Sequence, residues 1–152
     1  MASFAYSGAS RFCDGTFGVY YAAFDEETAI AETRYNTETR LREWREPSID
    51  VDKRVYVGAI AGEFEDLRAW PLSDPVYHPE NYGASQAYAT SLYAEDRADG
   101  IVYQSVRHAG GENIVAFRPR VVSHVRIAKY LQFRWDGNRI VAVTELTNIR
   151  AY

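Results

Sequence analysis

Four side chains in two separate stretches of the chain carry the chemical groups that a dinucleotide site requires. Residues 8–32 contain an arginine, a pair of tyrosines and a glutamate, and residues 100–117 add a serine and a further arginine. The set comprises a cation, an aromatic ring, a carboxylate and a hydroxyl, provided by Arg11, Tyr21, Glu32 and Ser105. An arginine fork suits a diphosphate, and none of these groups requires a metal.

Such a set could cleave the bond between nicotinamide and ribose in NAD. Nicotinamide is a pyridinium before cleavage, so it leaves as a neutral molecule without help from a general acid. The transition state resembles an oxocarbenium ion, and one carboxylate near the ribose offsets its positive charge. A second acidic residue is therefore not needed. No histidine–aspartate spacing marks Ser105 as a nucleophile, so we expect it to orient Glu32 or the ribose.

The first stretch has the pattern of a strand followed directly by a helix. Residues 19–24 are rich in β-forming side chains, Asp25 is a favourable N-cap, and a helix is predicted over residues 26–44. Tyr21 on the strand and Glu32 on the helix can then meet across the strand–helix turn.

The remaining pattern contains more strands than helices, and the helices do not alternate regularly with the strands. An Asp-Gly-Asn turn at residues 136–138 predicts a hairpin, residues 63–70 fit a short strand or a turn, and residues 71–79 predict a loop. A second helix is predicted over residues 82–98, and further strands over residues 54–60, 101–103, 114–117, 124–135 and 139–149. This order favours an α+β fold over a doubly wound sheet.

Length and composition indicate one domain over residues 1–152 and exclude several classes of protein. The chain has 152 residues, 47% of them hydrophobic, and a net charge of -4, which argues against direct nucleic-acid binding. The single Cys13 excludes an internal disulfide, and neither a signal peptide nor a membrane span is evident. A cytoplasmic location is therefore expected. The three histidines are scattered without metal-ligand spacing, and His108 is interpreted as a surface residue.

Several motifs, taken in order, resemble the RES domain family, which is named for its arginine, glutamate and serine. The family's first motif resembles G-V-Y-Y-A-A at 18–23 followed by E-T-A-I-A-E at 27–32. Its serine motif resembles G-I-V-Y-Q-S-V-R at 100–107, which is followed by Gly110, Gly111 and Asn113. Its usual ending is similar to F-R-W-D-G-N-R-I at 133–140.

The resemblance implies an α+β fold like that of ADP-ribosyltransferase toxins, with twisted, mostly antiparallel sheets and a few flanking helices. It implies a toxin of a bacterial type II toxin–antitoxin pair, neutralised by an Xre-type helix-turn-helix antitoxin, and it allows a homodimer inside that complex. NAD would be the substrate rather than a cofactor, degraded by phosphorolysis, with inorganic phosphate as co-substrate, or by hydrolysis. The implied site residues are Arg11 for the diphosphate, Tyr21 rather than Tyr20 for nicotinamide, Glu32 for the ribose and Ser105, with Arg107 and Asn113 as further substrate-binding residues.

Two other functions fit the same residues. A protein ADP-ribosyltransferase would use the same site with a macromolecular acceptor, as at least some members of the family do. A non-catalytic binding module would use these residues only structurally. The arginine-rich surface at residues 34–45 fits either a partner surface or a solvated helix face. Many members also carry a longer segment before the arginine, whose contribution is expected to be missing or replaced here.

Overall fold

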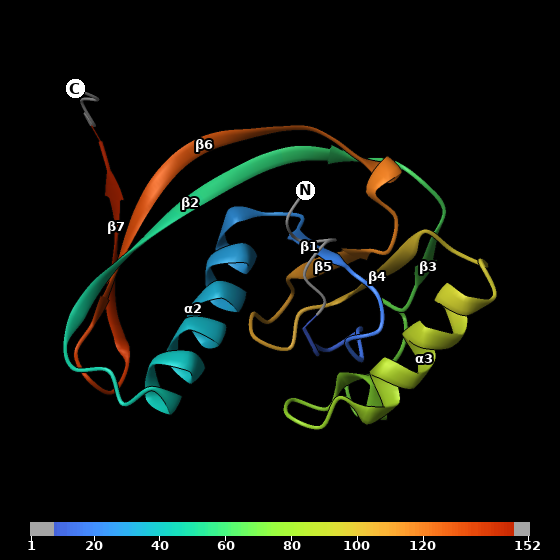
Figure 1. Cartoon of the computed structure of the whole chain (residues 1–152), viewed down its shortest axis with the longest axis horizontal. Coiled ribbons are helices and arrows are strands. Elements are labelled where there is room, and N and C mark those ends of the chain that lie inside the picture. The colour runs from blue at the N-terminus through green and yellow to red at the C-terminus, as the bar shows by residue number, and fades with distance from the viewer. Residues whose placement is uncertain (1–7, 148–152) are drawn as a thin grey trace. The chain divides into compact units, whose positions relative to one another are not determined.

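The computed structural model describes residues 8–147, and within them the chain has the predicted α+β composition (Figure 1). These residues form two α-helices, two short 3-10 helices and seven strands, which make two mostly antiparallel sheets. The chain forms two compact units, Met1–Ala29 with Ile60–Ser123 and Ile30–Ala59 with His124–Tyr152. The fold class predicted from the sequence is confirmed, whereas one domain over residues 1–152 stays a prediction.

The first unit is built on a four-stranded sheet whose two middle strands are apolar and buried. In the order β1-β5-β4-β3, β5 is antiparallel to both β1 and β4, and β3 is parallel to β4. Their bounds are Tyr20–Ala23 for β1, Phe64–Asp66 for β3, Gly100–Gln104 for β4 and Glu112–Ala116 for β5. Gly100 is needed for this packing, because an added Cβ would collide with the carbonyl oxygen of Val115.

Aromatic and aliphatic side chains pack the core of this unit between the sheet and helix α3 (Gly83–Ala94). Leu92 of α3 is 1% exposed, and Ile101 and Val115 of the sheet are completely buried. The ring of Phe17 stacks on that of Tyr93, with 4.1 Å between the ring centroids. The 3-10 helices are η1 (Pro75–Tyr77), within the predicted loop, and η2 (Pro119–Val121).

The second unit contains most of helix α2 (Glu26–Glu43) and a three-stranded sheet in the order β2-β6-β7. The strands are β2 (Ile49–Ile60), β6 (Val122–Trp135) and β7 (Ile140–Leu146). In its core, Leu41 of helix α2 packs against buried residues of the hairpin formed by β6 and β7. These are Leu131, Phe133, Trp135 and Ile140. Asp136 accepts the amides of Asn138 and Arg139 at 2.8 Å each, which confirms the predicted hairpin turn.

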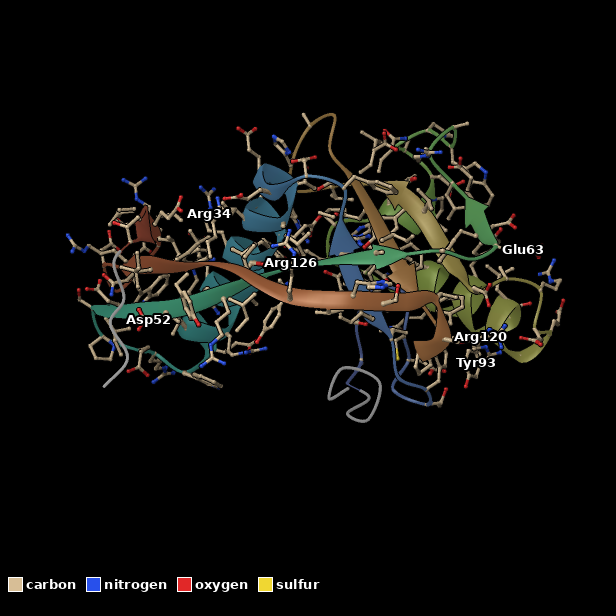
Figure 2. The ribbon with its side chains drawn as sticks, turned by 90° about the horizontal axis from the view of Figure 1, so that it is seen from above. Arg34, Asp52, Glu63, Tyr93, Arg120 and Arg126 are labelled. Atoms are coloured by element: carbon tan, nitrogen blue, oxygen red, sulfur yellow. The ribbon has the colours of Figure 1, made fainter. Side chains whose placement is uncertain are left out.

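Helix and strand ends are where the structure departs from the sequence pattern. Strand β2 begins at Ile49, five residues before its predicted start, because contacts between strands compensate for two aspartates that disfavour a strand. Asp50 and Asp52 accept bonds from Arg134 and Gln132 of β6, at 3.3 and 3.1 Å (Asp52 is labelled in Figure 2).

The second helix also stops earlier than predicted, at Ala94 instead of residue 98. The chain turns back there, with Asp96 at a φ of 50° and the Arg97 amide bonded to the Leu92 carbonyl at 3.2 Å. The predicted N-cap of α2 is confirmed, because the Asp25 carboxylate accepts the Thr28 amide at 2.8 Å. The predicted final strand ends at Leu146, and residues 148–149 of that prediction lie outside the described part of the chain.

Candidate active site

The loop that carries Arg11 is held by the first turns of helix α3. The side chain of Ser85, which is completely buried, donates to the carbonyl of Arg11 at 2.5 Å. Gln86 donates from its amide nitrogen to the carbonyl of Ser10 at 2.8 Å and to that of Cys13 at 3.3 Å. The backbone on both sides of Arg11 is therefore anchored by side chains more than 70 residues away in the sequence.

Tyr21 anchors the same loop from strand β1. Its hydroxyl accepts the amide of Phe12 at 2.9 Å and lies 2.8 Å from the hydroxyl of Ser10. Burial of the hydroxyl raises the pKa of Tyr21 to about 12, although 38% of the whole residue is exposed. The neighbouring Tyr20 instead packs against a cluster that includes Ala116. Of the two tyrosines, Tyr21 is thus the one on the side of the Arg11 loop.

The guanidinium of Arg11 is oriented by neutral groups of the segment at residues 76–82. Its Nη1 donates to the carbonyl of His78 at 2.8 Å and to that of Val76 at 3.3 Å. Its central carbon lies 4.6 Å from the centre of the Tyr82 ring, within the range of a cation–π contact. No carboxylate takes part in these bonds, and the two carbonyl bonds do not use Nε and Nη2.

Arg107 reaches the same segment from the turn that follows strand β4. Its Nη2 donates to the carbonyl of Pro79 and lies 3.5 Å from the hydroxyl of Tyr82. Arg11 and Arg107 therefore meet the ring and the hydroxyl of one tyrosine, although 96 residues separate them in the sequence (107 minus 11). Tyr82 was missed by the sequence analysis, where it appeared only as the first residue of a predicted helix.

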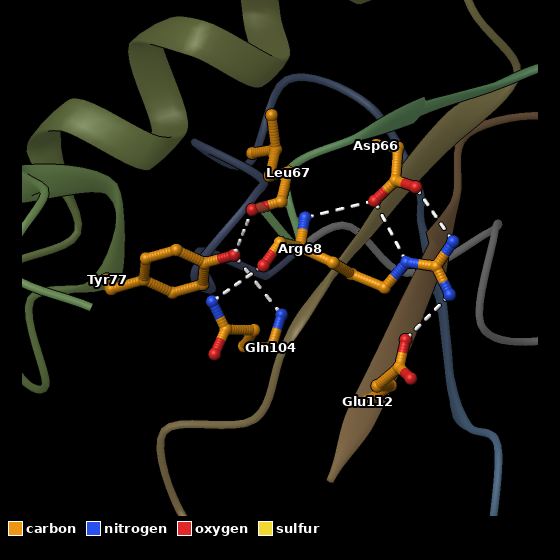
Figure 3. A network of polar contacts seen from close by, with 6 residues as sticks. All are labelled: Asp66, Leu67, Arg68, Tyr77, Gln104 and Glu112. Carbon is orange, nitrogen blue, oxygen red and sulfur yellow. Dashed lines mark hydrogen bonds and ion pairs between the residues drawn. The ribbon is translucent and has the colours of Figure 1, made fainter. Parts of the chain in front are cut away.

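The segment at residues 76–82 is itself fixed to the sheet by a polar network (Figure 3). The hydroxyl of Tyr77 donates to the carbonyl of Leu67 at 2.7 Å and accepts the amide of Gln104 at 3.2 Å. Tyr77 lies between the two residues whose carbonyls bind Arg11, so its anchor sets their position. Nearby, Arg68 forms ion pairs of 2.7 Å with both Asp66 and Glu112, and its hydrogen bonds lower the pKa of Asp66 to about 2.

Ser105 organises the turn that carries Arg107. Its side chain is 4% exposed, and its Oγ accepts the amides of Arg107 at 3.1 Å and of His108 at 3.0 Å. Its own amide donates to the carbonyl of Gly111 at 2.8 Å, which closes the turn. Asn113 follows on strand β5, where it is 3% exposed and pairs with Ala23 and Tyr103.

Glu32 belongs to the other compact unit. It lies half-buried on helix α2, seven residues after the N-cap residue Asp25 (32 minus 25). The structure thus brings Arg11, Tyr21, Ser105, Arg107 and Asn113 into one unit, whereas the expected meeting of Tyr21 with Glu32 stays a prediction.

The predicted arginine-rich surface on α2 has charge partners of its own. Arg42 and Arg34 lie 3.2 and 4.0 Å from Glu38, each four residues from it (Arg34 is labelled in Figure 2). Arg40 lies 5.8 Å from the ring of Trp44, which is 65% exposed. These contacts fit a solvated helix face, and a partner for this surface stays a prediction.

Within residues 8–147, no group of three or more His, Cys, Asp or Glu side chains is arranged to hold a metal ion. Among the same residues, no helix combines the length and the apolar character that crossing a membrane demands.

Two comparisons with known proteins agree with the motifs. A family model described as the RES domain matches residues 1–136. An uncharacterized protein named y4oC, from Sinorhizobium fredii (strain NBRC 101917 / NGR234), is 25% identical to this chain over 130 residues. That alignment covers 86% of this chain and 53% of y4oC, so the chain spans about half the length of this relative.

Proposed function

The chain belongs to the RES domain family, a family of NAD-acting toxins, and on this premise we propose that it cleaves the nicotinamide–ribose bond of NAD. The observation that carries the proposal is the meeting of Arg11 and Arg107 at Tyr82. The guanidinium of Arg11 is held by the carbonyls of Val76 and His78 and by the ring of Tyr82, which orient it without cancelling its charge. An arginine oriented in this way suits an anionic ligand such as a diphosphate, and Arg107 brings a second guanidinium to the same tyrosine.

In this proposal Arg11 binds the diphosphate through Nε and Nη2, and Arg107 adds a second cation. The ring of Tyr21 lies against nicotinamide, while its hydroxyl holds the Arg11 loop. That hydroxyl accepts the Phe12 amide and lies within hydrogen-bond distance of the Ser10 hydroxyl, and its raised pKa places its ionisation further above physiological pH.

Glu32 provides the negative charge that stabilises the oxocarbenium-like transition state, a role that rests on the family motif. The C1′–N bond breaks with its electron pair passing to the nicotinamide ring, which leaves neutral. Ser105 shapes the turn that presents Arg107 and, by the family resemblance, orients Glu32. Asn113, which is buried on strand β5 opposite Tyr103, is proposed from the family motif as a further substrate-binding residue.

The acceptor of the ADP-ribosyl group decides the reaction class. Inorganic phosphate gives phosphorolysis, water gives hydrolysis, and a protein side chain gives ADP-ribosylation. As a member of a toxin family, the chain would inhibit growth until an Xre-type antitoxin neutralises it, without binding nucleic acid itself. Its proposed location is the cytoplasm, where NAD is available.

The test follows NAD and its products by chromatography, with and without inorganic phosphate. We expect NAD loss in the wild-type protein and none in Glu32→Gln, which keeps the size of the side chain but removes its charge. Full turnover by a folded Glu32→Gln variant would contradict the mechanism. A radiolabel transferred from NAD to a protein of a cell lysate, without free ADP-ribose or its phosphate, would favour the ADP-ribosyltransferase.

A further inference from the structure

A chain of hydrogen bonds links the start of helix α2 to the turn that carries Ser105 and Arg107. The hydroxyl of Thr28, which is completely buried, donates to Oδ2 of Asp25 at 2.9 Å. The same hydroxyl lies 2.8 Å from Nδ1 of His108. All three residues belong to the first compact unit. His108 is therefore not the surface histidine that its glycine-rich surroundings predicted, but a half-buried ring with a fixed partner.

This arrangement determines which ring nitrogen of His108 carries a proton. A threonine hydroxyl has one proton, and here the Asp25 carboxylate, which cannot donate, accepts it. The bond between Thr28 and His108 must then be donated by the ring, so Nδ1 is protonated. In the neutral ring, Nε2 is left with a lone pair that can accept a proton.

Two further features fix the position of His108, one at its backbone and one beside its ring. The amide of His108 donates to Oγ of Ser105 at 3.0 Å, so the backbone of His108 is fixed by the same turn as Arg107. Gly111 lies next to the bond between Thr28 and His108. A Cβ added at Gly111 would collide with the hydroxyl of Thr28 and lie 3.0 Å from Nδ1 of His108. A glycine at this position leaves the space that the hydrogen-bond chain occupies.

We propose that His108 is the catalytic base that accepts the proton of an attacking water molecule. The proposal rests on the proposed function and assigns a residue to one branch of it. In hydrolysis, the C1′–N bond breaks with its electron pair passing to nicotinamide, and the water oxygen forms the new C1′–O bond. The water proton passes to Nε2, and the imidazolium then releases it to solvent.

When inorganic phosphate is the acceptor, no base is needed to remove a proton from the attacking group. The phosphate dianion already carries an unprotonated oxygen, so phosphorolysis proceeds without a base. His108 would thus matter for one acceptor and not for the other, a difference that a purely structural residue would not produce.

The charges around His108 agree with this role. Asp25 faces it from the start of α2, and the amide and hydroxyl of Thr28 hold the pKa of Asp25 below its ordinary value. Asp25 therefore remains a carboxylate at neutral pH and keeps its role as acceptor of the Thr28 hydroxyl. Arg107 lies beside it on the turn, and Glu112 at the start of β5 is paired with Arg68.

The test compares His108→Asn with the wild-type protein in both reactions. The asparagine amide can still donate to Thr28 in place of Nδ1, so the anchor is kept while the base is lost. We expect kcat for hydrolysis to fall about 100-fold with little change in KM, and phosphorolysis to stay within about threefold. Any loss of wild-type hydrolysis on the acid side that comes from protonation of the base should be absent in the variant, because the asparagine amide does not titrate.

A second pair of variants tests the hydrogen-bond chain. Thr28→Val removes the acceptor of Nδ1 with little change in volume and should slow hydrolysis about tenfold, whereas Thr28→Ser should retain it. Nitrogen NMR of the imidazole should show protonated Nδ1 in the wild type and a mixture of tautomers in Thr28→Val, independently of any turnover.

The outcomes separate the two proposals. Equal losses in hydrolysis and phosphorolysis, normal hydrolysis in His108→Asn, or NAD loss that requires phosphate would each overturn the role of His108 alone. A protonated Nδ1 that persists in Thr28→Val would also overturn it. A wild-type protein that consumes no NAD would overturn the proposed function and this role together.

Discussion

Two groups of arginines in this molecule are held in opposite ways. Arg11 is held by the carbonyls of Val76 and His78 and by the ring of Tyr82, all of which are neutral. On helix α2, Arg34 and Arg42 share the carboxylate of Glu38. Carbonyls orient a guanidinium without cancelling its charge, whereas a carboxylate does both. The difference teaches that the partner of an arginine, and not its exposure, indicates whether it is available to a phosphate.

The largest expected effect on NAD turnover comes from removing the positive charge of Arg11, the arginine held by carbonyls. Arg11→Gln should lower kcat/KM for NAD about 10- to 100-fold, the cost of one or two charge-assisted hydrogen bonds. The matched control is Arg34→Gln on α2, which should leave turnover unchanged. The measurement is NAD consumption by both purified variants, and an equal loss in the two would remove the basis of the comparison.

A smaller loss should follow when the tyrosine shared by the two arginines is changed. Tyr82→Leu removes both the ring beneath Arg11 and the hydroxyl near Arg107, and should raise KM for NAD about tenfold. Tyr82→Phe keeps the ring and should stay within about threefold of the wild type. If the two variants behave alike, the ring does not orient Arg11.

The anchor of the Arg11 loop should be visible in stability at high pH. The pKa of Tyr21 is raised from 10.0 to about 12 in the folded state, so the unfolded chain loses this proton first. The contribution of Tyr21 to stability is complete below about pH 10 and is lost as the pH rises through about 12. Thermal unfolding between pH 9 and 11.5 should show a steeper decline in the wild type than in Tyr21→Phe. Parallel declines would mean that the hydroxyl is not held as described.

The smallest effect is expected at a carboxylate-held arginine on the surface. The pKa of Asp66 is lowered from 3.8 to about 2, chiefly by hydrogen bonds from Arg68, so its contribution is present above pH 4 and is lost as the pH falls through about 2. Asp66→Asn should reduce the stability at pH 7 by no more than about 1 kcal/mol, because the pair is exposed. Chemical denaturation at pH 7 and pH 3 measures this, with little NAD activity lost at pH 7. A loss of several kcal/mol would mean that the network in Figure 3 carries far more stability than an exposed pair.

Local sequence signals predicted most of the elements correctly. The N-cap at Asp25, the hairpin at Asp136 and the apolar strands around Ile101 and Val115 all depend on residues close together in the chain. The start of β2 was missed because its aspartates are tolerated only through partners on β6, which a local pattern does not contain.

The sequence nominated residues for the site without locating it. Ser105 stands in a motif, Arg11 and Tyr21 were assigned by the family resemblance, and their roles stay predictions. Tyr82 stands in no quoted motif, and His108 follows the serine motif directly without being one of its named residues; their partners are 71 and 80 residues away (82 minus 11 and 108 minus 28). Only their contacts reveal them.

The sequence by itself determined the α+β class and the membership of the RES domain family, because caps, turns and motif order are local properties of the chain. The tertiary structure alone decided that Arg11 and Arg107 share Tyr82, and that the hydroxyl of Thr28 links Asp25 to His108. Those contacts join distant segments, and their geometry is set by how the sheet and helix α3 pack. Whether a guanidinium faces a carbonyl or a carboxylate is therefore a result of folding, and with it the charge that remains for a ligand.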